Sequence, residues 1–185
     1  LVFGLALPLN AIQILWVNFF TDSFPAISLA FEDGIDYLLQ KPRRLSEGLV
    51  DAQMRFLILA IGIPTSILLF GIYAILLKLQ FDPMTVKTFI FATFGTYSLF
   101  LVFAVRSLQK SIFSYGLFSN PYLVAGTAIG GISMIGAFYI TILQKTLHTV
   151  SLPPIWIAGV FAIGLINIGA VELGKWWLNN KNNSK

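Results

Sequence analysis

Three side chains that carry oxygen lie close together in an otherwise apolar stretch of this sequence. Asn18, Thr21 and Asp22 all fall within the apolar run from Ile12 to Phe31. Residues three and four apart share one face of a helix, so the spacing predicts that these three side chains point the same way. A charged residue at the centre of a membrane helix costs about 2.5–3.5 kcal/mol or more, so a carboxylate here is a functional-site hypothesis.

Pro25 adds a backbone oxygen to this group. Proline has no N–H, so Pro25 cannot bond the carbonyl four residues earlier, which belongs to Thr21. Hard cations such as calcium and magnesium prefer carboxylate, amide and carbonyl oxygens, and broken helices near the middle of the membrane hold ion sites in transporters. The residues therefore predict a cation site. The alternative is a polar seam that hydrogen-bonds neighbouring helices.

The composition indicates an integral membrane protein. Apolar residues make up 57% of the chain and charged residues only 11%, whereas soluble domains have about 45–50% and about 25%. The absence of cysteine excludes disulfides and a thiolate metal site. The single histidine, His148, is expected in an outer loop, and no cluster of His, Cys and carboxylates predicts zinc.

The apolar runs predict an all-α membrane protein, a helical transmembrane bundle. A span needs roughly 20 apolar residues. Residues 1–9 are too short for one and are expected to be the end of a helix, stopped by Pro8 and Asn10. Five complete spans are expected at about 12–31, 56–78, 88–105, 122–143 and 155–177. Since the chain opens inside a helix without an initiator Met, we expect it to be a piece of a longer protein.

The distribution of basic residues predicts the orientation of these spans. Three of the twelve Lys and Arg, namely Lys78, Lys87 and Lys145, lie on one side, and the other nine lie on the opposite side. By the positive-inside rule, the nine are cytoplasmic. The cytoplasmic segments are therefore the loops 32–55 and 106–121 and the tail 178–185, which is expected to lack regular structure.

The residues around the predicted site resemble a known family. The run PLNAIQILWVNFFTDSFPAISLAFE, followed at a short interval by QKPRR, resembles the sixth transmembrane helix and the next cytoplasmic loop of type II P-type ATPases. It is most similar to reticulum-type and bacterial calcium pumps. The motif covers about residues 8–44. The four spans that follow the motif in this chain resemble, in number, the seventh to tenth transmembrane helices of the family. Residues 1–9 would then be the end of its fifth helix.

The resemblance assigns roles to individual residues. Asn18, Thr21 and Asp22 match cation ligands of the family's sixth helix. Sodium/potassium pumps usually carry Asp at the position of Asn18, and secretory-pathway and plasma-membrane calcium pumps often carry Met at that of Thr21. Both residues therefore favour a reticulum-type or bacterial calcium pump. The span at 88–105 has no Asp or Glu, where reticulum-type pumps place a carboxylate for a second calcium, so at most one bound cation is expected.

The function implied by this resemblance is part of an ATP-driven pump. The chain would be its C-terminal transmembrane domain and would export calcium from the cytoplasm, in the cell membrane of a prokaryote. The chain has no aspartyl-phosphate motif and no phosphate-binding glycine loop, so we predict no catalytic or cofactor-binding residue in it and no ATP hydrolysis by it alone. ATP and Mg²⁺ would act only through upstream domains, in the same or a separate chain. The expected partners are the lipid bilayer and those domains, without nucleic acid.

Two alternatives stay open at this point. The same family could pump manganese or sodium, since the same oxygens suit manganese. From a different class, the chain could be a membrane scaffold that lost the catalytic half of a pump and serves as an interaction partner.

Two pairs of residues outside the motif have structural interpretations. Gly126 and Gly130 form a small-xxx-small pair that lets helices approach closely. Glu172 and Lys175 are expected to form a local ion pair at the inner interface. A second cation ligand or a proton path at Glu172 is the alternative.

Overall fold

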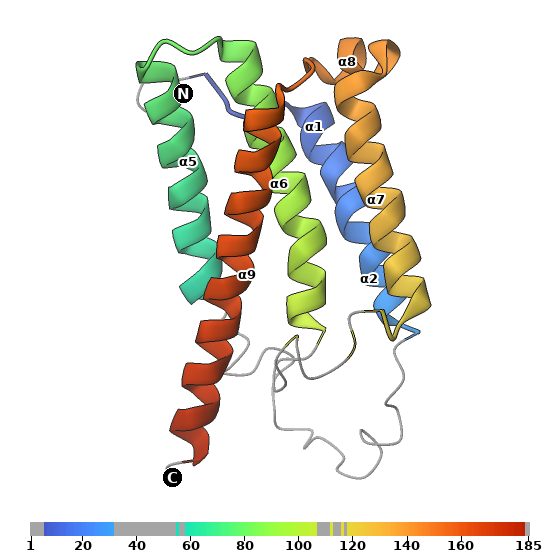
Figure 1. The fold of residues 1–185 in the computed structure, drawn as a ribbon, viewed down its shortest axis with the longest axis vertical. Coiled ribbons are helices and arrows are strands. Elements are labelled where there is room, and N and C mark those ends of the chain that lie inside the picture. Colours follow the sequence, from blue (N-terminus) through green and yellow to red (C-terminus); the bar gives the residue numbers. More distant parts are fainter. Residues whose placement is uncertain are drawn as a thin grey trace.

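The chain folds into an upright bundle of helices, seen from the side in Figure 1. The structure is a computed structural model that describes residues 6–31, 55, 58–106, 112, 116 and 118–183. The predicted loop 32–55, except Arg55, and most of the predicted loop 106–121 lie outside these described residues.

The first membrane segment changes its helix type along its length. It begins as α1 (Ala11–Trp16), continues without a break as the π-helix η1 (Val17–Ser23), and ends as α2 (Phe24–Leu29). The start of α1 is fixed by a reciprocal capping box between Asn10 and Gln13. Both side chains also donate to the carbonyl oxygen of Leu147, at 3.2 and 3.0 Å. The start of this segment is thereby tied to the last residue of α8.

The remaining helices follow in chain order. They are η2 (Ile58–Gly62), α5 (Ile63–Lys78), α6 (Pro83–Val105), α7 (Pro121–Tyr139), α8 (Thr141–Leu147) and α9 (Pro154–Asn183). Among the described residues, α6, α7 and the Pro154–Trp177 part of α9 are long and apolar enough to cross a membrane. The described part contains helices and no strand, so the predicted all-α membrane bundle is confirmed.

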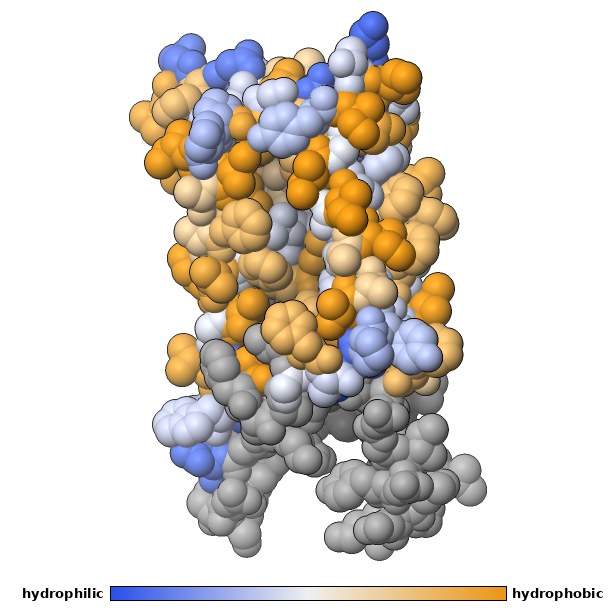
Figure 2. Space-filling view, turned by 45° about the vertical axis from the view of Figure 1, so that its right-hand side comes forward, coloured by the Kyte–Doolittle hydropathy of each residue, from blue (hydrophilic) through white to orange (hydrophobic). Residues whose placement is uncertain are grey.

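Helix α6 occupies the middle of the bundle. Figure 1 shows it between α5 and α9 on one side and the α1–η1–α2 segment and α7 on the other. Its side chains fill the core, and Val86, Phe91 and Thr93 are fully buried. Figure 2 shows apolar residues over the middle of one face and hydrophilic residues at the end of the bundle where α8 lies. This distribution is the one that a lipid-facing surface needs.

Two helix ends differ from the sequence-based expectation. Helix α7 ends at Tyr139, and the extended backbone of Ile140 separates it from α8, so the apolar run 122–143 holds two helices. Helix α9 continues to Asn183. The prediction of a tail without regular structure was therefore wrong for residues 178–183. The sequence after Gly174 has no Pro or Gly to end the helix.

Candidate cation site

The predicted site residues lie on the π-helix η1, Val17–Ser23. A π-helix has hydrogen bonds from residue i to i+5, and such wide turns are frequent at functional sites. Two side chains bond the backbone inside it: the Thr21 hydroxyl donates to the Val17 carbonyl at 2.9 Å, and the Ser23 hydroxyl to the Asn18 carbonyl at 2.7 Å. Pro25 lies in the first turn of α2, where a missing N–H is tolerated.

The three predicted ligands do not all face the same way. Asn18 and Asp22 have exposed side chains, whereas Thr21 is only 1% exposed. Asn18 and Asp22 therefore share an open side of η1, and Thr21 turns its side chain into the bundle. The prediction of a common face therefore holds for Asn18 and Asp22 but not for Thr21. Their role as metal ligands stays a prediction, as does that of the Thr21 carbonyl.

A hydroxyl of α6 belongs to the same site. The Ser98 side chain lies close to the Asp22 carboxylate. Ser98 is one of the hydroxyl residues in the carboxylate-free span noted above, but sequence reasoning gave it no role. The relative register of two packed helices leaves no trace in the spacing along either one, so only the structure reveals this contact.

A row of polar groups continues from this point toward α9. Tyr97, next to Ser98, lies close to the side chain of Thr65. The Thr65 hydroxyl donates to Asn167 Oδ1. Asn167 in turn donates to the Ile163 carbonyl at 3.0 Å. Thr65 and Asn167 are both buried. Paired polar groups of this kind hold membrane helices together, so the row fixes α6 against α5 and α9.

Close packing by α7 fixes the opposite side of η1. A Cβ atom added to Gly126 would lie 3.0 Å from the Phe24 carbonyl oxygen, and one added to Gly130 would lie 2.9 Å from that of Phe20. The two glycines therefore let the α7 backbone lie directly against η1 and α2, as the small-xxx-small spacing predicted. The wide turn is held between α6 and α7.

Aromatic rings surround the same turn. The Phe20 ring lies 4.4 Å from that of Trp16 and 6.0 Å from that of Phe24, centroid to centroid. Phe19 packs edge-on against Phe20 and Phe24. These apolar rings leave Asn18, Asp22 and Ser98 as the polar side chains of the site. No three His, Cys, Asp or Glu side chains gather as a metal cluster in the part of the chain that the structure describes.

The sequence matches known proteins over nearly its whole length. Residues 6–177 match the family described as cation transporting ATPase, C-terminus. The chain is 33% identical to calcium-transporting ATPase 1 of Bacillus cereus, an alignment that covers 94% of this chain and 20% of that protein. It is 32% identical to a calcium-transporting ATPase of Bacillus subtilis, over 83% of this chain and 17% of the relative.

A human relative shows the same pattern. The calcium-transporting ATPase type 2C member 2 of Homo sapiens is 35% identical over 82% of this chain and 16% of its own length. The chain therefore spans at most about a fifth of the length of these curated relatives. The family match, the relatives and the helical membrane bundle agree with the resemblance of the Asn18–Pro25 motif, and the chain belongs to the cation-transporting ATPases, as part of their C-terminal transmembrane region.

Proposed function

We propose that this chain is the C-terminal transport region of an ATP-driven calcium pump, in which Asn18, Thr21 and Asp22 form part of a single calcium site. The observation that carries the proposal is the exposed Asp22 carboxylate on a π-helix inside a membrane segment. The relatives are named as calcium-transporting ATPases, which supports calcium as the transported ion.

The exposure of Asp22 indicates that other helices complete the site. Asp22 lies well inside the segment that runs from α1 to α2, Ala11–Leu29. An ionised carboxylate that faced hydrocarbon there would be costly. Calcium takes about 6–8 oxygen ligands, more than Asn18, Asp22 and the nearby hydroxyls provide. We infer that upstream helices of the same pump cover the open side of η1 and supply the remaining ligands.

The chemistry of α6 supports one bound ion. The sequence of α6, Pro83–Val105, contains no Asp or Glu, and its contact to the site is the neutral Ser98 hydroxyl. Two divalent ions side by side would need more negative charge than Asp22 and the upstream ligands of one site supply. In this proposal ATP and Mg²⁺ act through upstream domains. The end of α9 is cytoplasmic, and the membrane is the cell membrane of a prokaryote.

The test measures calcium-dependent phosphoenzyme formation in the full-length pump that contains this chain. Asp22→Asn should raise the calcium concentration for half-maximal phosphoenzyme about tenfold or more, since about 1.4 kcal/mol of lost binding gives a factor of ten. Asp82→Asn is the matched control, because Asp82 is an exposed carboxylate at the outer start of α6 and its replacement should leave calcium affinity unchanged. Wild-type calcium affinity in Asp22→Asn would refute the assignment of Asp22 as a ligand.

The same assay separates the alternatives. If phosphoenzyme forms at lower concentrations of manganese or sodium than of calcium, that ion and not calcium is the transported ion. If no phosphoenzyme forms with any of these ions, the result would support the alternative of a membrane scaffold that lost the catalytic half of a pump. Equilibrium binding of close to two calcium ions per pump would contradict the single site.

A further inference from the structure

The Ser23 side chain forms a hydrogen bond in an unusual register. Its hydroxyl donates to the Asn18 carbonyl, five residues earlier in the chain, at 2.7 Å. Serine and threonine hydroxyls inside helices ordinarily bond a carbonyl three or four residues earlier, as the exposed Ser66 does with the Gly62 carbonyl. The bond of Ser23 instead spans the same five residues as the backbone bonds of the π-helix η1, at whose end it lies.

The π-helical register decides which side chains of the site face the same way. In an α-helix each residue turns by about 100°, so Thr21 would lie about 60° from Asn18 on one side and Asp22 about 40° from it on the other. A π-turn closes over five residues and holds more than four, so three steps leave Thr21 more than about 90° away from Asn18, while Asp22 stays close to it. The exposed Asn18 and Asp22 and the buried Thr21 agree with the wide turn.

The two registers compete for the Asn18 carbonyl. In an α-helix this carbonyl accepts from the residue four positions later, which is Asp22, and in a π-helix it accepts from the next residue, which is Ser23. A carbonyl oxygen has two lone pairs, so it can accept a hydroxyl as well as a backbone N–H. The Ser23 hydroxyl therefore adds a second bond that only the π-helical register rewards.

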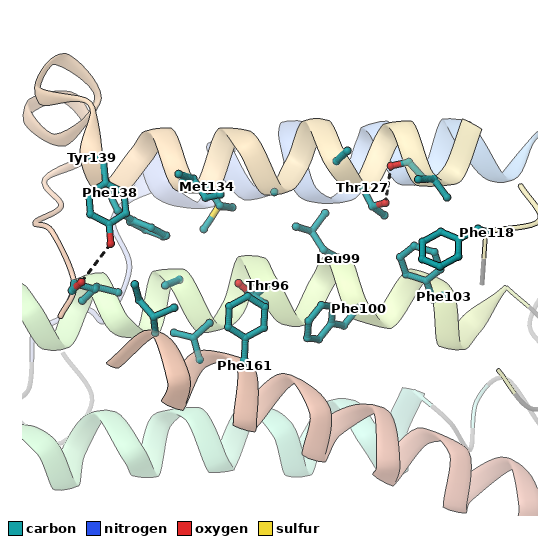
Figure 3. A pocket seen from close by; sticks show the side chains of 18 residues that line it. Thr96, Leu99, Phe100, Phe103, Phe118, Thr127, Met134, Phe138, Tyr139 and Phe161 are labelled. Atoms are coloured by element: carbon teal, nitrogen blue, oxygen red, sulfur yellow. Dashed lines mark hydrogen bonds between the residues drawn. The ribbon is translucent and has the colours of Figure 1, made fainter. Parts of the chain in front are cut away.

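The helices behind η1 pack against it through apolar groups. Figure 3 shows the cavity between α6 and α7, whose lining includes Leu99 and is almost wholly apolar. Its Thr127 hydroxyl donates to a carbonyl of its own helix at 2.8 Å. Leu99 also touches the Cβ position of Gly130, which lies against the Phe20 carbonyl of η1. Apolar packing of this kind fixes where η1 lies, whereas the register of its hydrogen bonds depends on polar groups such as the Ser23 hydroxyl.

The surroundings of Ser23 strengthen its bond. Ser23 is exposed, as are Asn18 and Asp22, so all three side chains border the open side of η1. This segment, Ala11–Leu29, lies in the membrane. A hydrogen bond in a low-dielectric environment is electrostatically stronger than one in water. The bond from Ser23 to Asn18 is therefore stronger than that of a serine on a wet surface.

We propose that Ser23 is a positioning residue of the candidate cation site. Its hydroxyl holds the Asn18 carbonyl in the π-helical register, which keeps Asn18 and Asp22 on the open side of η1 and Thr21 turned inward. This inference rests on the proposed function, because it gives Ser23 a part in binding the transported cation. Without the hydroxyl, η1 shifts toward the α-helical register, the angle between Asn18 and Asp22 changes, and the site binds calcium less tightly.

The test measures how phosphoenzyme formation by the full-length pump depends on calcium. Ser23→Ala should raise the calcium concentration for half-maximal phosphoenzyme about fivefold, which corresponds to about 1 kcal/mol, the contribution of one hydrogen bond. The maximal phosphoenzyme level should not change. Ser23→Thr keeps the hydroxyl and should restore wild-type affinity. Ser66→Ala is the matched control, because Ser66 is also exposed and bonds its own helix but lies on α5, and it should leave calcium affinity unchanged.

A double variant separates positioning from direct contact with the ion. In the wild type the Thr21 hydroxyl points inward, so Thr21→Val should lower calcium affinity only about threefold. In the Ser23→Ala background the α-helical register returns Thr21 toward the site, so the same change should cost about tenfold, because the two residues are coupled through the turn. If the two single losses simply multiply, Ser23 does not set the register and the proposal is overturned.

Two further variants keep the outcome decisive. Ser23→Val has the shape of Ser23→Thr without its hydroxyl, so it repeats the measurement if Ser23→Ala does not fold, and it should show the same fivefold loss. Wild-type affinity in the folded Ser23 variants together with weakened binding in Asp22→Asn would overturn the role of Ser23 alone. Wild-type affinity in Asp22→Asn as well would overturn the proposed cation site on which that role depends.

Discussion

The backbone of Gly130 lies directly against the carbonyl oxygen of Phe20. A Cβ atom on Gly130 would be 2.9 Å from that oxygen and 2.5 Å from Leu99 Cδ2, closer than side-chain atoms normally approach. Phe20 belongs to the π-helix η1, which also carries Asn18 and Asp22. The distance between α7 and the candidate cation site is therefore set at a residue without a side chain.

Gly130→Ala should destabilise the bundle. The added methyl group must displace backbone at Phe20 or the Leu99 side chain, and overpacking of this kind costs about 1–3 kcal/mol. Gly131→Ala is the control, because the same methyl group meets open space there and a helical Ala is favoured over Gly by about 0.5–1 kcal/mol. Unfolding of the purified pump in detergent, followed by circular dichroism, measures both changes. Equal stability of the two variants would contradict the close contact.

Thr21 should matter less for calcium binding than Asp22. Its hydroxyl is buried and donates to the Val17 carbonyl, whereas the Asp22 carboxylate is exposed on the open side of η1. We expect Thr21→Val to lower calcium affinity about threefold and to cost about 1 kcal/mol of unfolding free energy for the lost hydrogen bond. Thr21→Ser keeps the donor and should restore both. Calcium titrations of phosphoenzyme formation check the order, and a loss in Thr21→Val as large as that in Asp22→Asn would show that the hydroxyl reaches the ion.

Much of the fold could be predicted because its signals are local. The starts of α6 and α7 follow from Asp82-Pro83 and Asn120-Pro121, pairs in which the first side chain caps the helix and the proline occupies its first turn. The end of α7 at Tyr139 could not be predicted, because the sequence stays apolar through Ile140 and only the packing of the turn into α8 interrupts the helix.

The candidate site was predicted in composition but not in geometry. Spacing rules for an α-helix placed Asn18, Thr21 and Asp22 on one face. The π-helix changes the number of residues per turn, and the side chain of Thr21 points inward as a result. Pro25 was the local signal for an irregular helix, yet nothing in it specifies a π-turn. The Ser98 contact depends on how α6 packs against η1, which no single segment encodes.

Asp82 should make the start of α6 sensitive to acid. Its carboxylate accepts hydrogen bonds from the Thr85 backbone N–H and hydroxyl, both at 2.8 Å, and the backbone bond first and then the hydroxyl hold the pKa of Asp82 below its ordinary value. A carboxyl whose pKa is lower in the folded state stabilises the fold above its unfolded pKa of about 3.9. This stabilisation is lost as the pH falls through the folded pKa.

Asp82→Asn separates the charge from the cap. Asparagine also caps helices well, so the variant should approach the wild type in stability only at pH values below the folded pKa of Asp82 and should be less stable near neutral pH, where only the wild type carries the charge. Thermal unfolding of the two proteins at a series of pH values measures the difference. A constant difference across this range would show that the carboxylate charge contributes nothing.

The ion pair between Glu172 and Lys175 joins the C-terminal part of α9 to the α6–α7 connection. Lys175 Nζ lies 2.7 Å from Glu172 Oε1, as the sequence predicted, and Glu172 Oε2 accepts a hydrogen bond from the Ile112 backbone N–H at 3.2 Å. Lys175 is 2% exposed, while the Glu172 side chain is 15% exposed. Glu172→Gln should therefore cost about 3 kcal/mol of unfolding free energy, because it leaves a buried ammonium without this carboxylate.

The reverse change should be milder. Lys175→Met removes the buried charge and leaves Glu172, which reaches solvent more easily and still accepts from Ile112. The double variant Glu172→Gln/Lys175→Met should recover part of the loss seen in Glu172→Gln, because no ammonium remains buried. Unfolding measurements on the three variants form a double-mutant cycle. If Lys175→Met costs as much as Glu172→Gln, the pair is an exposed one whose two charges are equally solvated, and its burial does not set the stability of this end of α9.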